Sequence, residues 1–348
     1  MRLSPNLSRT IIFMWIVVYI VLGSIDLSFI SSELGKDSTG LMAIVEDPGG
    51  WDGSSSYYAS AVLFSYLPDV LLQPVIFLIG AAALFFFMNR LRTLNSLMIA
   101  MYVSLPAILL FLVRLQKETL VVPMSMLAVM YISSNKNSFI SKVIMTAVLY
   151  SIYAVIVRPY YLIIVAVFLG VLILMYARPQ YKFVLVASFC ALLFILPPEI
   201  FMKIQGIRDI VNYYRVGDGT EGARTAFLNL MTPDNAGAFI VNYFYAFAKL
   251  NLAPLFYFGV KEIWLMSVLS IYFYFIYKGI RSEDKKLVIC SSVLIAHIAV
   301  YTLFEPDLGS YLRHLSSAFL YLTPIMIYVF NKRKAKKIYV NGVKIKDS

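Results

Sequence analysis

Long apolar runs, separated by mostly short polar connections, are the dominant pattern along this chain. A run of about 20 apolar residues can cross the roughly 30 Å hydrocarbon core of a bilayer as a helix, which satisfies its own backbone hydrogen bonds there. The runs fall at residues 11–30, 70–88, 94–113, 119–132, 142–157, 160–177, 183–201, 261–277, 287–304 and 315–330. The pattern therefore predicts an all-α polytopic membrane protein with about ten transmembrane helices, residues 1–348 forming one integral membrane domain.

Two connections, at residues 31–69 and 202–258, are much longer than the rest. At the start of the second, apolar residues repeat at helical spacing from Ile200 to Tyr214, which predicts a helix lying on the membrane surface. Thr232 and Pro233 then predict the start of another helix, with Thr232 as its N-cap. Both a lid that closes over a substrate and a plain packing cover fit this pattern.

The distribution of charge predicts the orientation of the helices. Only 14% of the residues are charged, and 19 of the 30 Lys and Arg residues fall in alternate connections and in the tail at 331–348. Because positive charge collects on the cytoplasmic side, both termini are predicted to be cytoplasmic and the two long loops periplasmic, in a bacterial inner (plasma) membrane. The net charge of +11 comes from dispersed residues, so no nucleic-acid partner is expected.

The chain offers few groups for metal or redox chemistry. Cys190 and Cys290 both fall inside apolar runs, where a thiol behaves as a small hydrophobe. The sequence has two histidines and lacks the motifs of phosphate-binding loops, dinucleotide sites and zinc hydrolases. It therefore predicts no metal site and no cofactor.

Several cations break the orientation pattern because they lie in predicted outer connections. They include Arg114, Lys117, Arg158, Arg208, Arg215 and Arg313, and the second long loop also holds Lys203 and Arg224. A planar guanidinium can bind phosphate oxygens through two parallel hydrogen bonds, so as a group these residues predict a site for a diphosphate. Singly, each also fits a long side chain that snorkels to the interface.

Acids and aromatic residues accompany these cations. The polar stretch from Glu305 to Ser317 places two acids and His314 at a membrane boundary, where ionisable groups are costly and need a reason to be there. In the first long loop, the aromatic residues Trp51, Tyr57 and Tyr58 lie near two acids, Asp47 and Asp52. Aromatic faces and carboxylates suit a sugar, and an interfacial aromatic belt with solvated acids is the other interpretation.

Together these features resemble bacterial O-antigen and exopolysaccharide polymerases of the Wzy and EpsG type. The resemblance lies in the layout of the runs and in four motifs: Asp52 with Tyr57 and Tyr58, Lys117 with Glu118, Arg158 with Pro159, and Leu312-Arg313-His314 running into Tyr321-Leu322-Thr323-Pro324. It implies a membrane fold of the glycosyltransferase C (GT-C) type that polymerises undecaprenyl-diphosphate-linked oligosaccharide repeat units on the periplasmic face. The implied partners are the lipid-linked glycan donor and acceptor and the bilayer, with a chain-length regulator and a flippase as further candidates.

The resemblance also implies roles for individual residues. Arg158, Arg313 and an Arg of the second long loop would neutralise the diphosphate leaving group, and Asp52 or His314 would be the base for the acceptor hydroxyl. Other GT-C enzymes that use lipid-phosphate sugars are the nearest alternative. A lipid-linked oligosaccharide flippase would need charges along a path from both sides, and a membrane O-acyltransferase would centre on His297 within a span; both are weaker interpretations.

Overall fold

The computed structural model describes residues 2–25, 36–47, 56–217 and 224–337, without the side chains of 36–37, 56, 214–217 and 331–337. Throughout this part of the chain the elements are helical, apart from one isolated bridge between Arg2 and Thr93, which confirms the predicted all-α class. The α-helices are α1 (Pro5–Ser24), α2 (Lys36–Glu46), α3 (Ser56–Ser65), α4 (Asp69–Met88), α5 (Leu94–Ala107), α6 (Val121–Ser133), α7 (Phe139–Ile156), α8 (Tyr161–Tyr176), α9 (Pro179–Ile195), α10 (Pro198–Gly217), α11 (Ala236–Asn251), α12 (Val260–Ile280), α13 (Lys285–Phe304), α14 (Leu308–Ser316) and α15 (Leu322–Lys337). Short 3-10 or π turns are η3 (Ile108–Leu112), η4 (Lys117–Leu120), η6 (Ala253–Leu255) and η7 (Phe319–Tyr321).

In the described part of the chain, six helices are long and apolar enough to cross a membrane: α1, α4, the continuous α5–η3 helix, α7, α12 and α13. A seventh span results if α9 and the first part of α10, which meet at 92°, are taken together. The helices α8 and Phe319–Phe330 are apolar but shorter, and the run at 119–132 forms the short η4 and α6. The chain therefore has the helices of a membrane protein, and the number of ten spans stays a prediction.

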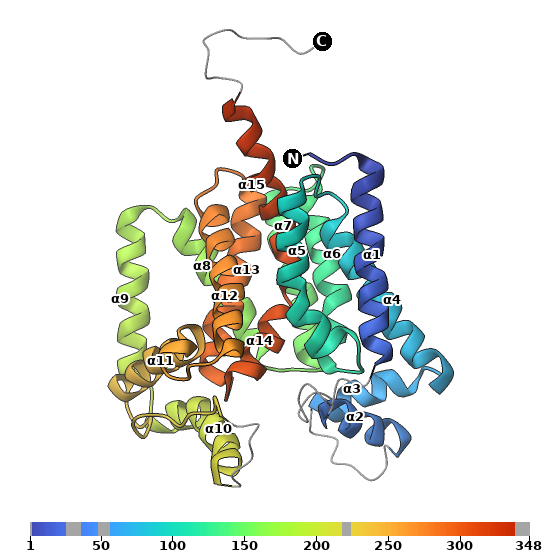
Figure 1. Ribbon diagram of the computed structural model, residues 1–348. Helices are drawn as coiled ribbons and strands as arrows, with labels where there is room; N and C mark the ends of the chain where they lie inside the picture. Colours follow the sequence, from blue (N-terminus) through green and yellow to red (C-terminus); the bar gives the residue numbers. More distant parts are fainter. Residues whose placement is uncertain (1, 26–35, 48–55, 218–223, 338–348) are drawn as a thin grey trace.

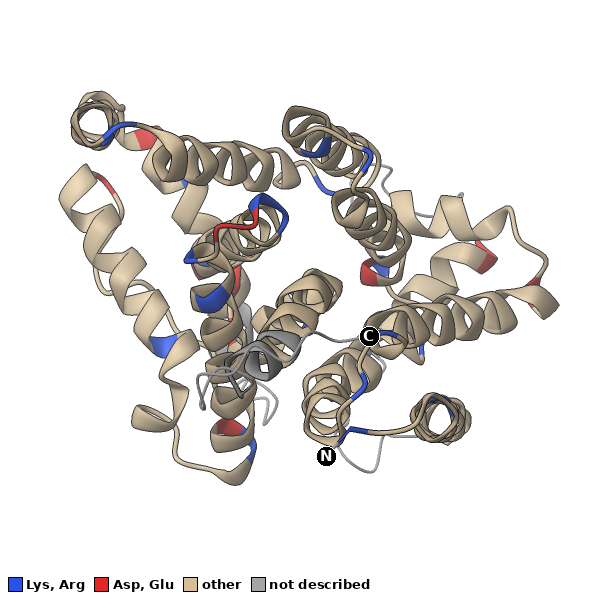
Figure 2. Cartoon of the chain, turned by 90° about the horizontal axis from the view of Figure 1, so that it is seen from above, with Lys and Arg blue, Asp and Glu red and all other residues tan. Residues whose placement is uncertain are grey.

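The start of α1 and the end of α15 lie at one end of the helix bundle, called here the termini end, whereas α2, α3 and α10 lie at the opposite, loop end (Figure 1). At the termini end, the N–H of Leu3 donates to the carbonyl of Arg92 at 2.9 Å. There too, the ammonium of Lys286 donates to the carbonyl of Ser133 at 3.1 Å. Connections rich in Lys and Arg thus meet at this end, and Figure 2 shows their charges as short separate segments on largely uncharged ribbons. The compartment that each end faces stays a prediction.

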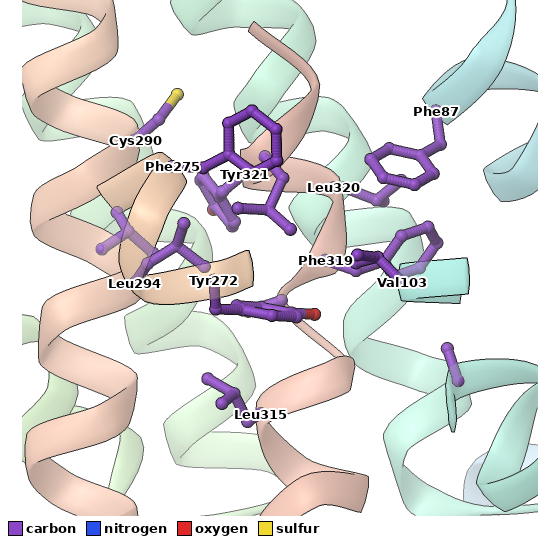
Figure 3. Packing of buried hydrophobic residues seen from close by; sticks show 14 of the residues in the cluster. Phe87, Val103, Tyr272, Phe275, Cys290, Leu294, Leu315, Phe319, Leu320 and Tyr321 are labelled. Carbon is purple, nitrogen blue, oxygen red and sulfur yellow. The ribbon is translucent and has the colours of Figure 1, made fainter. Parts of the chain in front are cut away.

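α13 forms the centre of the bundle. Of its 18-residue apolar stretch 78% is buried, against 17% for α1, and it packs against α8, α12 and α15. Figure 3 shows Cys290 of α13, Tyr272 of α12 and Tyr321 of η7 in the same packed interior. The ring of Phe319 in η7 packs edge to face against that of Phe87 in α4, with the ring centres 4.9 Å apart. A helix enclosed on all sides needs apolar residues all round, which explains the continuous apolar run at 287–304.

The first span differs from the predicted boundaries. α1 begins at Pro5 because the Ser4 side chain accepts the N–H of Leu7 at 3.2 Å and proline suits the first turn. The helix ends at Ser24, so the span covers Pro5–Ser24 and the predicted range of 11–30 is wrong at its start.

The two predicted long loops contain helices. In the first, α2 and α3 pack together and against α4 through a small core that includes Leu41 and Phe64. In the second, the helical pattern from Ile200 to Tyr214 is confirmed by α10. The next helix, α11, begins at Ala236 because the Asn235 side chain caps it, so the prediction of Thr232 as N-cap is wrong.

The end of the α5–η3 helix is fixed by side chains from two other helices. Pro106 lacks a backbone N–H, and the wider π turn η3 follows it. The Tyr19 hydroxyl donates to the carbonyl of Leu112 at 2.8 Å, and the Gln73 amide donates to that of Val113 at 3.2 Å. These bonds satisfy carbonyls at a helix end and set the direction in which the chain enters η4.

Gly80 in α4 provides the space that Tyr19 occupies. A Cβ atom on Gly80 would overlap the Tyr19 hydroxyl, which is buried and hydrogen-bonded. We expect Gly80→Leu to lower the free energy of unfolding by about 1–3 kcal/mol, the usual cost of overpacking, measured as a lower Tm of the purified protein in detergent. Gly170→Leu is the matched control, since a Cβ at Gly170 meets no atom within 4 Å. Equal Tm values for the two variants would contradict this role of Gly80.

Candidate functional site

Glu118 is the centre of a buried ion cluster at the loop end of the bundle. Its Oε1 atom lies 2.9 Å from Nη2 of Arg158, 2.6 Å from Nε2 of His314 and 3.6 Å from Nε of Arg313. The side chains of Glu118 and Arg158 are 1% and 4% exposed, whereas Arg313 is 18% exposed. Three basic side chains from distant segments therefore converge on one shielded carboxylate.

The short turn η4 positions Glu118. The carbonyl of the preceding residue, Lys117, accepts a hydrogen bond from the hydroxyl of Tyr153 in α7 at 3.2 Å. Glu118 and its neighbour Thr119 are both buried. Because η4 connects the fixed end of η3 to α6, its backbone holds the carboxylate between α7 and α14.

Arg158 lies in the turn between α7 and α8. Its N–H donates to the carbonyl of Tyr153 at 3.2 Å, and Pro159 disfavours continuation of the helix. Its Nη1 donates to the Tyr160 hydroxyl at 2.6 Å, while Nη2 donates to Glu118. The Tyr160 ring stacks on Phe304 with the ring centres 5.7 Å apart, so the guanidinium is tied to the end of α13 as well.

Arg313 and His314 occupy the last turn of α14. α13 ends just before Pro306, and Asp307 caps the following helix by accepting the N–H of Ser310 at 2.9 Å. Cations near the carboxyl end of a helix are stabilised by its dipole. The sharp turn between α13 and α14 therefore presents both basic side chains toward η4.

His314 lies between two carboxylates. Its Nε2 faces Glu118, and its Nδ1 bonds Glu305 at the end of α13. The two ring nitrogens thus face carboxylates from two different segments, so the imidazole links η4 to the end of α13.

Glu118 stays ionised despite its burial. Burial by itself raises the pKa of Glu118, but the charges of Arg158 and Arg313 and the hydrogen bond from His314 outweigh it and hold this pKa well below its usual 4.5. Its second oxygen, Oε2, accepts no hydrogen bond from any residue that the structure describes. The carboxylate therefore orients three basic groups and retains acceptor capacity.

Lys117 extends the cluster toward α3. Its Nζ lies 3.7 Å from the centre of the Tyr57 ring, a cation–π contact. Tyr58 is half-buried beside Tyr57 against the α2–α3 core, and Arg114 is half-buried at the end of η3. The predicted site residues that the structure brings together are Lys117, Tyr57, Arg158, Arg313 and His314.

Arg208 has a different environment. Its guanidinium is buried, donates to the carbonyl of Thr302 at 3.3 Å and to Asn229, and lies 4.8 Å from the centre of the Phe227 ring. Asn212, one turn further along α10, donates to the carbonyl of Pro306 at 2.8 Å. These contacts fasten α10 to the end of α13, so Arg208 has a structural role here. Its predicted diphosphate contact stays a prediction.

Three predicted site residues are not placed. Trp51 and Asp52 lie outside the described residues, and Arg215 belongs to α10 but its side chain is not described. The predicted roles in sugar binding, proton transfer and diphosphate binding stay predictions for these residues.

The sequence prediction gave no site role to Glu118 or Glu305. Both acids stand at the end of an apolar run, where a carboxylate is costly unless it is paired. Glu118 also directly follows Lys117, one of the cations in the predicted site. An acid beside an outer-loop cation could have identified Glu118, and an acid directly after a long apolar run could have identified Glu305.

Within the described ranges, no set of three His, Cys, Asp or Glu residues could hold a metal ion. Glu118 and Glu305 face opposite nitrogens of His314, so these three groups do not converge on one point. Cys290 is buried in α13, and Cys190 is exposed on α9.

His297 is enclosed in the core. Its Nδ1 lies 2.9 Å from the carbonyl of Val293. The rings of Tyr150 and Tyr301 each lie with their centre 5.3 Å from that of His297. This is the environment of a packing histidine with a local hydrogen bond.

The fold and the cluster define a class of protein: a helical membrane protein with several spans and a buried Glu–Arg–His cluster at one end of its bundle. Comparisons with protein-family models, curated proteins and solved structures find no match. The chemistry of the cluster is therefore the basis for inferring a function.

Proposed function

We propose that this protein is a bacterial inner-membrane glycosyltransferase that polymerises undecaprenyl-diphosphate-linked oligosaccharide repeat units at the cluster around Glu118. The observation that carries the proposal is the convergence of Arg158, Arg313 and His314 on one buried carboxylate at the end of an apolar bundle. Ionisable groups held at a membrane boundary mark functional sites. A lipid diphosphate combines an apolar chain with a polyanionic headgroup and so matches both parts of this arrangement.

The basic groups of the cluster stabilise the leaving group. Cleavage of the bond between the anomeric carbon and the diphosphate oxygen leaves negative charge on the diphosphate, and preorganised cations lower the energy of that step. Arg158 and Arg313 donate pairs of N–H bonds to phosphate oxygens. An N–H of the His314 ring is a further donor to the leaving oxygen.

Glu118 acts in two successive ways. In the resting site its carboxylate holds the basic groups in position. When the diphosphate draws those groups toward itself, Glu118 loses neutralising charge and its pKa rises, so its carboxylate can take the proton of the acceptor hydroxyl. One proton leaves the hydroxyl, its oxygen bonds to the anomeric carbon, and the electron pair of the broken bond stays on the diphosphate.

The neighbouring elements complete the site. Tyr57, beside Lys117, offers an aromatic face to a sugar next to the diphosphate. α10, fastened by Arg208 and Asn212, serves as a cover that limits access of water. The bundle is GT-C-like in this proposal, with the loop end in the periplasm and both termini in the cytoplasm.

Other functions explain the buried ion cluster and its surroundings less completely. Another GT-C glycosyltransferase that uses a lipid-phosphate sugar would also need buried arginines and an acid, and it is the nearest competitor. A flippase would need charges along the whole path. An O-acyltransferase centred on His297 has little support, because aromatic rings enclose that side chain.

The test is the pattern of lipid-linked and exported glycans in a strain that lacks this gene. We expect single repeat units on the final acceptor and no ladder of longer chains, with the ladder restored by a plasmid copy. Loss of every unit from the outer face would instead identify a flippase, and a full ladder without acyl groups would identify an acyltransferase.

A further inference from the structure

An apolar groove of about 610 Å³ runs along the outer face of α7. It is lined by Val143, Ile144, Ala147, Val148, Ser151, Ile152, Val155 and Ile156 of α7 and by Leu169 of α8. Ala147 and Ser151 are small and lie one turn apart, so they form a floor between bulkier neighbours. Ser151 is the only residue with a polar side chain among those that line it.

The groove lies lengthwise along a helix long and apolar enough to span a membrane, and the turn that follows this helix contributes Arg158 to the ion cluster. At 1.5 Å per residue, the stretch from Val143 to Ile156 is roughly 20 Å long, about two thirds of the hydrocarbon thickness of a bilayer. Its last two residues, Val155 and Ile156, stand at the loop end of α7. Arg158, which binds Glu118, follows two residues later.

We propose that this groove binds the polyprenyl chain of the lipid diphosphate whose headgroup occupies the cluster, an inference that rests on the proposed function. The positive charges of the Arg158 and Arg313 guanidinium groups, at the loop end of α7, complement the negative charge of a diphosphate. A single groove suits a lipid with one chain on its headgroup, whereas a glycerophospholipid brings two. The substrate thus lies with its chain along α7 and its diphosphate beside η4 and α14.

α9 provides an internal reference for ordinary lipid contact. None of its residues is buried, and Phe183, Phe189 and Phe194 project from it with more than half of their surface exposed. Bulk lipid therefore reaches α9 without a shaped site. A lipid that binds specifically in the groove must contact α7 more than α9.

The experiment uses the full-length protein in nanodiscs and a polyprenyl diphosphate that carries a photoreactive diazirine in its chain. Labelled peptides are identified by mass spectrometry, with and without excess unlabelled polyprenyl diphosphate. We expect labelling of the peptide 143–156 to exceed that of α9 by about tenfold and to be competed by the unlabelled lipid. Ala147→Phe and Ser151→Phe, which fill the groove, should reduce it about tenfold, whereas Ala166→Phe, at an exposed position on α8 outside the groove, should not.

Equal labelling of α7 and α9 without competition would identify bulk lipid contact and overturn the groove proposal. Competition by a phospholipid as effective as that by polyprenyl diphosphate would also overturn it. The binding assay needs no glycan product, so its result is separate from the ladder test. If the photoreactive lipid labels the groove and is competed, but deletion of the gene leaves the glycan ladder intact, the lipid site is retained and the polymerase function is rejected.

Discussion

Glu118→Gln is expected to abolish the glycan ladder and to lower the yield of folded protein. Removal of one partner from a buried ion pair leaves the other charge without compensation, at a cost of about 3–5 kcal/mol. Here the stranded group is Arg158, whose side chain is 4% exposed and lies 2.9 Å from the carboxylate. The measurements are thermal unfolding in detergent and gel analysis of glycan chain length.

A second variant separates folding from catalysis. In Glu118→Gln with Arg158→Met both buried charges are removed, and such paired replacement is often close to neutral for stability. We expect this double variant to recover most of the lost Tm while remaining without a ladder. Glu199→Gln, an exposed acid in the first turn of α10, is the control that should change neither property. A ladder of normal length in the Glu118→Gln strain would remove Glu118 from the mechanism.

The difference in Tm between wild type and Glu118→Gln should become smaller only at acid pH. The pKa of Glu118 is lowered on folding, since the charges of Arg158 and Arg313 and the bond from His314 outweigh the effect of burial. A group with a depressed folded pKa contributes stability that is present above its unfolded pKa and is lost as the pH falls through the folded value. The Tm gap between wild type and Glu118→Gln is therefore expected to be constant at neutral pH and to narrow progressively as the pH falls below 4.5 toward the lower folded pKa.

Arg313→Lys is expected to shorten or remove the ladder while leaving the Tm nearly unchanged. Arg313 is the most exposed member of the group around Glu118, and its Nε lies 3.6 Å from that carboxylate, so the fold depends on it less than on Arg158. Lysine keeps the charge but cannot donate two parallel bonds to a phosphate. Loss of one charge-assisted bond costs about 1.5–3 kcal/mol, which is roughly a ten- to hundredfold loss of rate.

The control for this variant is Arg224→Lys. Arg224 is exposed and donates to the carbonyl of Phe258 at 2.7 Å, so the conservative change should leave the ladder unaffected. If the Arg313→Lys protein extends chains like wild type at limiting enzyme, Arg313 supplies only charge. The diphosphate site would then depend on Arg158 and Lys117.

Tertiary packing explains why the candidate site was found only in part from the sequence. Arg158, Arg313 and His314 drew attention because each is a basic residue at an outer span end. Their meeting point, Glu118, lies 40 residues before Arg158 and could be located only when η4, the α7–α8 turn and α14 were placed in space. Arg208 matched the same sequence criterion, yet its guanidinium bonds the carbonyl of Thr302, because α10 folds back on the end of α13.

The sequence by itself determined the all-α class, the main apolar helices and the helical character of α10, because backbone hydrogen bonding in an apolar medium and helical periodicity are local effects. It did not determine where α1 and α11 begin, since the Ser4 and Asn235 side chains act as caps only in particular backbone conformations. Only the tertiary structure decided which charges meet. A buried carboxylate selects its partners by distance and desolvation, and those depend on the packing of segments far apart in the chain.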